Sequence, residues 1–236
     1  MRLLVSPKDE TEARKAAKGG ADIIDVKNPA EGSLGANFPW TIRHIRETLS
    51  PNTEISATLG DLPNLPGTAS LAAYGLTMLG VDYVKAGLLG VKSQKEAEYM
   101  SKMIVRSVKS CNPKVKVVLA GYADWGDAGS ISPSTLVKAA SKAKAEFVML
   151  DTRVKDGRTL LDYLDTGEIR RFATSAKAKG LKIGLAGSLD EDAICELASI
   201  KPDVVGVRGA VCVGGKRTSR ISEAKVRNLS RLVARL

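Results

Sequence analysis

Three segments of this chain repeat one local pattern: Gly20-Ala21-Asp22-Ile23-Ile24-Asp25, Gly80-Val81-Asp82-Tyr83-Val84-Lys85 and Lys201-Pro202-Asp203-Val204-Val205-Gly206. In each, a helix end leads through a turn containing aspartate into a short apolar run. Runs of this kind are typical of buried parallel strands. Eight apolar runs occur, at about residues 2–6, 22–26, 54–58, 82–86, 115–120, 147–150, 182–186 and 204–207.

Helix-like stretches separate these runs. One covers residues 8–18, and the others begin near residues 39, 68, 93, 133, 168, 190 and 219. Strands that alternate with helices indicate βαβ units and a parallel sheet. The chain has 236 residues, close to the roughly 250 of one (β/α)₈ barrel, although a doubly wound domain of this length is also compatible. Eight units without a linker favour an α/β fold with a single (β/α)₈ TIM-barrel domain over residues 1–236.

The net charge of +10 raises the question of an anionic partner. Lysines and arginines are spread through the helical stretches, and aromatic residues, only 4% of the chain, do not accompany them. A nucleic-acid-binding surface usually clusters both kinds of residue. We therefore expect no nucleic-acid partner, and assign most of the charge to solvated helix faces and the rest to the attraction of phosphates.

Several other classes of site are disfavoured. The three cysteines are too scattered for a disulfide framework or a structural zinc site, and a single histidine, His44, excludes multi-histidine metal centres. No dinucleotide-binding fingerprint is present. We expect no metal and no cofactor. The absence of a signal-like or membrane-spanning apolar stretch predicts a cytoplasmic protein without a membrane partner.

Charged residues stand where several of the predicted strands end. They are Asp25, Lys27, Lys85, Asp151 and, on the following loop, Lys155. In a (β/α)₈ barrel the active site lies at these ends, and the inward layers are built from alternate strands. Residues two apart on a strand share a face, so Asp25 and Lys27 point inward together. Strands two, four and six then bring these side chains into one layer, unless they form only satisfied ion pairs.

This set of residues suits amine catalysis on a carbonyl compound. A lysine attacks an aldehyde or ketone only as the neutral amine, and a free lysine with a pKa of about 10.4 is rarely neutral at pH 7. Burial and nearby cations such as Lys85 and Lys155 lower a lysine pKa, whereas Asp25 and Asp151 raise it. We expect the two aspartates to orient groups and transfer protons.

The last two strand ends predict a phosphate site. Loops after strands seven and eight of such barrels frequently bind phosphate through backbone N–H groups. Gly187, Ser188 and Gly209 permit close approach of the backbone, and Arg208 adds charge. The segment 32–37 after the second strand is either another anion cradle or a plain loop.

The strand ends together resemble the (5-formylfuran-3-yl)methyl phosphate synthase family, also described as 4-(hydroxymethyl)-2-furancarboxaldehyde-phosphate synthases, of methanofuran biosynthesis. The motifs that carry the resemblance run through the whole chain: Val5-Ser6-Pro7-Lys8, residues 20–29, Glu31-Gly32-Ser33-Leu34-Gly35-Ala36-Asn37-Phe38-Pro39-Trp40, residues 120–124, Met149-Leu150-Asp151-Thr152, residues 154–157, Leu185-Ala186-Gly187-Ser188 and residues 205–210.

The resemblance implies a carbon–oxygen lyase that condenses two molecules of glyceraldehyde 3-phosphate to the furan aldehyde phosphate, with loss of phosphate and water. It implies a Schiff base on Lys27 and a proton acceptor at Lys85. Asp25, Asp151 and Lys155 match further active-site positions. The residues alone leave open an aldolase or isomerase acting on another sugar phosphate, and a non-catalytic binder of anions. They also leave homo-oligomer formation open.

Overall fold

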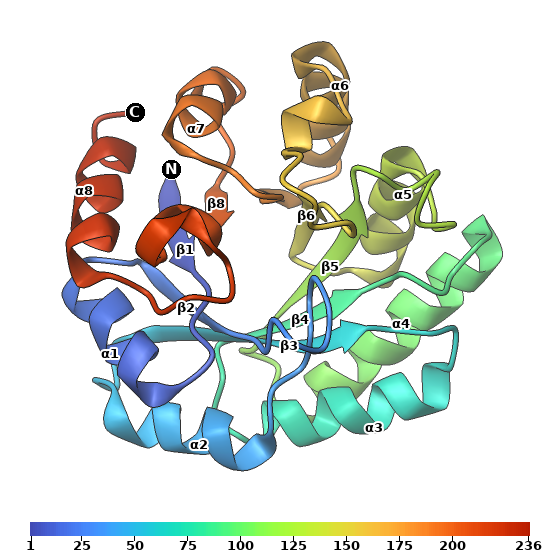
Figure 1. The fold of residues 1–236 in the computed structure, drawn as a ribbon. Helices are drawn as coiled ribbons and strands as arrows, with labels where there is room; N and C mark the ends of the chain where they lie inside the picture. Colours follow the sequence, from blue (N-terminus) through green and yellow to red (C-terminus); the bar gives the residue numbers. More distant parts are fainter.

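The computed structural model describes all residues 1–236 and shows eight parallel strands in a closed barrel with the order β1 to β8 (Figure 1). The single-domain (β/α)₈ prediction for the fold is confirmed. The strands are β1 (Arg2–Val5), β2 (Ile23–Val26), β3 (Glu54–Asp61), β4 (Tyr83–Gly87), β5 (Lys116–Tyr122), β6 (Phe147–Asp151), β7 (Lys182–Leu185) and β8 (Val204–Val207). β1 pairs with β8 and closes the ring.

Eight helices surround the barrel, each following the strand of the same number (Figure 1). They are α1 (Glu10–Lys18), α2 (Pro39–Thr48), α3 (Pro66–Thr77), α4 (Gln94–Cys111), α5 (Pro133–Ala143), α6 (Thr166–Lys177), α7 (Glu191–Ala198) and α8 (Glu223–Val233). No helix has both the length and the apolar character needed to cross a membrane.

Helix starts follow the local sequence closely. Proline stands in the first turn of α2, α3 and α5, where its missing N–H costs nothing. Ser93 opens α4 and Asp165 opens α6, each in a capping box with the glutamate three residues on. The last helix begins at Glu223, later than the expected start near Ser219, because a β-bridge between Cys212 and Ile221 holds the preceding loop extended.

Successive side chains of each strand point to opposite faces, so the barrel has two hydrophobic cores. A large cluster that includes Ile24 and Val26 packs between the strands and the helices, whereas Ile23 belongs to a smaller cluster inside the barrel. Tyr83 and Phe147 lie in the same inner cluster, with their rings edge to face. On β2 the inward face therefore continues from Ile23 through Asp25 to Lys27, and the inner core forms the floor on which the polar residues stand.

Candidate active site

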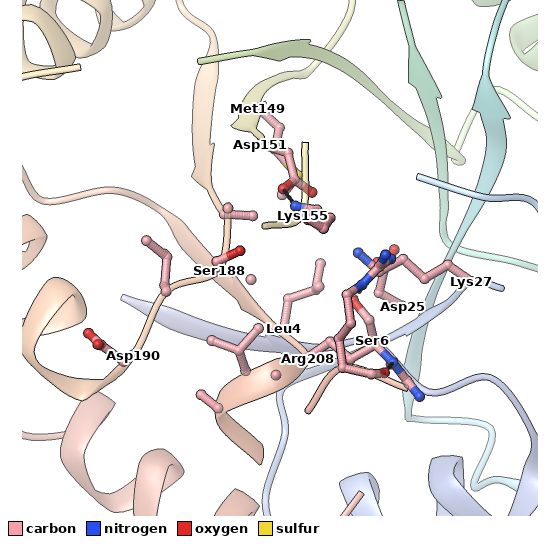
Figure 2. A pocket seen from close by; sticks show the side chains of 18 of the residues that line it. Leu4, Ser6, Asp25, Lys27, Met149, Asp151, Lys155, Ser188, Asp190 and Arg208 are labelled. Atoms are coloured by element: carbon pink, nitrogen blue, oxygen red, sulfur yellow. Dashed lines mark hydrogen bonds and ion pairs between the residues drawn. The ribbon is translucent and has the colours of Figure 1, made fainter. Parts of the chain in front are cut away.

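A cavity of about 360 Å³ lies at the carboxyl ends of the strands. Its lining includes all nine residues predicted from the sequence: Asp25, Lys27, Lys85, Asp151, Lys155, Gly187, Ser188, Arg208 and Gly209. Figure 2 shows Lys27 and Asp25 at one side of this cavity, with the Asp151–Lys155 pair and Ser188 at others. The convergence expected from strand register is thus present.

Asp25 is fully buried and forms three hydrogen bonds. Its Oδ2 accepts from Nζ of Lys85 at 2.6 Å and from the hydroxyl of Ser6 at 3.0 Å, and its Oδ1 accepts from the hydroxyl of Ser56 at 2.7 Å. Burial alone would raise the pKa of Asp25, but the charges of Lys85 and Lys27 and the hydrogen bonds from Lys85 and Ser56 lower it below the usual range. Asp25 is therefore an anion that holds Lys85 in place.

Asp151 and Lys155 form a second pair at the end of β6. Nζ of Lys155 lies 2.6 Å from Oδ1 of Asp151 and also donates to Oγ1 of Thr152 at 2.9 Å. Burial opposes the charge of Asp151, but Lys155 and Lys27 outweigh it and bring the pKa of Asp151 to about 2. This carboxylate is ionised throughout the physiological range.

Lys27 differs from the other two lysines. Its side chain is only 7% exposed, yet no carboxylate oxygen lies within the 4.0 Å of an ion pair. Burial is the main cause that lowers the pKa of Lys27 to about 8; Lys85 and Lys155 lower it further, and Asp151 and Asp25 oppose them. The ion-pair alternative thus describes Lys85 and Lys155, and leaves Lys27 as the amine that is partly neutral near pH 7.

The loops after β7 and β8 present unused backbone donors to the cavity. Gly187 and Ser188 adopt positive φ angles of 113° and 52°, which turn the chain sharply after β7. The N–H groups of Gly187, Ser188, Gly209 and Ala210 donate to no acceptor within the chain. Such a concave set of free N–H groups is suited to an anion.

Arg208 lines the cavity as predicted, but its guanidinium group is already engaged. Its five N–H donors contact the two carboxylate oxygens of Glu12 and the backbone oxygens of Ser6, Arg217 and Ser219. Both Arg208 and Glu12 are buried. The expectation that Arg208 contributes free charge to a phosphate therefore needs revision, because Glu12 neutralises that charge and fixes the group behind the loops.

The segment 32–37 does bind an anion, and the anion is a side chain of the chain itself. Oδ2 of Asp61, at the end of β3, accepts from the N–H of Ser33 at 3.0 Å and of Leu34 at 3.4 Å. Tyr122 donates its hydroxyl to the other oxygen of Asp61 at 2.5 Å. Ser33 in turn donates to the carbonyl of Thr152 at 2.6 Å. We call residues 28–37 the β2 strap, because these contacts hold them across the barrel mouth.

Several of these contributors were not identified from the sequence. Glu12 is a helical residue with no strand-end signal, and Arg217 lies beyond β8 in a stretch without a recognisable motif. Asp61 and Tyr122 do stand at strand ends, which is the signal that could have marked them. No group of three or more His, Cys, Asp or Glu side chains is arranged to hold a metal ion.

The chain is thus a (β/α)₈ barrel with a polar cavity at the carboxyl ends of its strands, where two lysines are paired with carboxylates and a third is not. Residues 3–230 match the sequence model of the 4-HFC-P synthase family. The chain belongs to this family. It is 49% identical to the (5-formylfuran-3-yl)methyl phosphate synthase of Methanothermobacter thermautotrophicus and 50% identical to that of Archaeoglobus fulgidus, in each case over 99% of both chains.

Solved structures confirm the architecture at much lower sequence identity. Phosphoribosyl anthranilate isomerase from Thermus thermophilus superposes with a TM-score of 0.64 at 19% identity, covering 100% of this chain and 99% of that one. A 3-hexulose-6-phosphate synthase gives 0.65 at 17% identity, with 99% and 98% covered. These likenesses show the barrel fold alone.

Proposed function

We propose that this chain is a Schiff-base-forming lyase that condenses two molecules of glyceraldehyde 3-phosphate to (5-formylfuran-3-yl)methyl phosphate in methanofuran biosynthesis. Release of one phosphate and two waters balances the atoms. Family membership supports the product, and one structural observation supports the mechanism. Lys27 is a buried amine with a pKa of about 8 and no carboxylate partner, near two lysines that each have one.

The reaction begins when neutral Lys27 attacks the carbonyl carbon of the first triose phosphate. Loss of water from the carbinolamine gives a protonated imine, which withdraws electrons and acidifies the adjacent carbon. Removal of that proton leaves an enamine. The second molecule loses its phosphate by elimination across C2 and C3, and the enamine carbon attacks the electrophilic C3 that results. The C2 oxygen of the second molecule then adds to the imine carbon and expels the Lys27 amine, and loss of water leaves the furan.

Lys85 and Asp25 are placed to move the proton next to the imine. Their 2.6 Å hydrogen bond lets a proton pass between amine and carboxylate, and both border the same cavity as Lys27. In this scheme the Lys85 ammonium group first passes a proton to Asp25 across this hydrogen bond, and the neutral amine then accepts the substrate proton. Asp25 also fixes the position of Lys85. Ser6 and Ser56 keep Asp25 from turning away.

Asp151 and Lys155 serve the elimination steps. The Lys155 ammonium group is held beside Asp151 and lines the cavity, so it can donate a proton to a leaving oxygen. Its carboxylate partner stays ionised, with a pKa of about 2, and stabilises the cationic imine on Lys27.

The first substrate phosphate binds in the loops after β7 and β8. The free N–H groups of Gly187, Ser188 and Gly209 supply the donors, and Arg208 supports the loop through Ser219 and Arg217 from behind. This arrangement leaves the carbonyl end of the substrate to extend toward the lysines.

Product analysis tests the reaction. The purified protein with glyceraldehyde 3-phosphate as sole substrate should form a product that absorbs in the near ultraviolet and has the mass of the furan aldehyde phosphate, together with one inorganic phosphate per furan. An aldolase or isomerase acting on another sugar phosphate gives neither the absorbance nor the phosphate. Absence of both with active, folded protein would contradict the proposal.

A further inference from the structure

The cavity contains five basic side chains, and they divide into two groups. The five are Lys27, Lys85, Lys155, Arg208 and Arg217. Three of them pair with a carboxylate: Lys85 with Asp25, Lys155 with Asp151 and Arg208 with Glu12. Lys27 and Arg217 have no carboxylate within the 4.0 Å of an ion pair. The amine chemistry accounts for Lys27, whereas nothing in the proposed reaction yet accounts for Arg217.

Arg217 connects the loop after β8 with the loop after β2. It belongs to the loop after β8, where Gly214 and Gly215 adopt φ angles of 65° and 71° and turn the chain back over the cavity. Its Nη2 donates to the carbonyl of Gly32 in the β2 strap at 2.9 Å. The guanidinium group therefore reaches the β2 side, while the free N–H groups of Gly187, Ser188 and Gly209 lie after β7 and β8.

Most of the guanidinium of Arg217 is unused by the protein. Nη2 makes its single side-chain hydrogen bond, and neither Nε nor Nη1 donates to any group of the chain. The side chain is partly buried and lines the cavity. Arg208, in contrast, uses every donor. A planar group with free N–H pairs at a cavity wall matches the oxygens of a phosphate monoester.

We propose that Arg217 binds the phosphate group of the second triose phosphate, the molecule that the enamine attacks. This inference rests on the proposed function, in which two phosphorylated molecules share one cavity. The loops after β7 and β8 hold the phosphate of the molecule bound to Lys27. Arg217 supplies a separate anion site on the β2 side, and its contact with Gly32 keeps the guanidinium oriented there.

The test separates the first chemical step from the second. Borohydride trapping with glyceraldehyde 3-phosphate reports the imine on Lys27, and furan absorbance reports condensation. Arg217→Ala should give the same trapped adduct as the wild type at the same substrate concentration. Its apparent KM for furan formation should rise about 10–100-fold, the range expected when one or two hydrogen bonds to a charged group are lost. Arg217→Lys keeps the charge without the planar pair of donors, so its apparent KM should fall between the values of the wild type and of Arg217→Ala.

Lys216→Ala is the matched control, because this neighbouring basic residue is exposed and outside the cavity. It should leave both readouts unchanged. An Arg217→Ala variant with unchanged furan kinetics would overturn the inference, as would parallel loss of adduct and furan in a protein with wild-type thermal stability. So would an equal effect of Lys216→Ala. If the wild type itself forms no adduct, the proposed function fails instead.

Discussion

Nζ of Lys85 lies 2.6 Å from Oδ2 of Asp25 in an ion pair whose two side chains are 2% and 0% exposed. Because of this pair, the three lysines of the cavity differ in whether a carboxylate partners them. Lys85 and Lys155 each keep a carboxylate partner, and their charges then act on Lys27, which has none. Lys27 is thus the one lysine of the three that is buried without an ion pair.

The pH dependence of activity should show an acidic limb near pH 8. The pKa of Lys27 is lowered to about 8, so the fraction of neutral amine rises tenfold per pH unit below that value and levels off above it. A rate of imine formation measured by rapid borohydride quench between pH 6 and 10 should follow this curve. A limb near pH 10.4 would show that the pKa of Lys27 is not lowered.

Asp151→Asn should move this limb to lower pH. Asp151 is the largest influence that raises the pKa of Lys27, so removal of its charge favours the neutral amine. Lys155 then loses its partner and acts in the same direction. The midpoint of the pH profile is the readout, because the total rate will also fall as Lys155 loses its position. A midpoint moved to higher pH would contradict the assigned electrostatics.

Lys27→Met should stabilise the folded protein at neutral pH. The folded pKa of about 8 lies below the unfolded value of about 10.5, so the buried ammonium costs stability below pH 8. This cost disappears as the pH rises toward 10.5, where both states are neutral. Methionine fills similar volume without a charge, and we expect a gain of about 1–3 kcal/mol in denaturant unfolding at pH 7. The difference from the wild type should vanish above pH 10.5.

Lys85→Met should have the opposite effect and destabilise the folded protein. It leaves the buried carboxylate of Asp25 without its cation, which costs about 3–5 kcal/mol. The double variant Asp25→Asn, Lys85→Met should recover part of that loss, since no unpaired charge remains. Additive losses in the urea unfolding of the single and double variants would show that the pair is not coupled.

The β2 strap should loosen in Tyr122→Phe. The hydroxyl of Tyr122 is one of three donors to Asp61, which holds the backbone of Ser33 and Leu34. We expect a loss of about 1–3 kcal/mol in stability and faster amide hydrogen exchange in a peptide covering residues 28–37. Tyr99→Phe, at an exposed tyrosine of α4, should change neither. Unchanged exchange in the strap would refute this role of Tyr122.

The barrel was predictable because each local rule points the same way. Apolar runs, helix caps and proline starts agree with eight βα units, and two-residue alternation on β2 placed Asp25 and Lys27 inward together. Strand-end position was enough to find nine of the residues that line the cavity.

The partner of each charged side chain could not be predicted in the same way. Whether Arg208 faces a phosphate or a carboxylate depends on Glu12, which lies 196 positions away in the chain and meets it only in the closed barrel. The segment 32–37 likewise has the features of an anion cradle, but Asp61 is the group that fills it. Arg217 reaches the site through a loop without periodicity, so no pattern indicated it.

The most direct test of the central claim is the position of the trapped adduct. Wild-type protein reduced with borohydride in the presence of glyceraldehyde 3-phosphate, then digested and mapped by mass spectrometry, should carry the triose modification on Lys27. Lys27→Arg, which keeps a charge but cannot form the imine, should carry none and make no furan. An adduct on Lys85 or Lys155, or full activity in Lys27→Arg, would contradict the account.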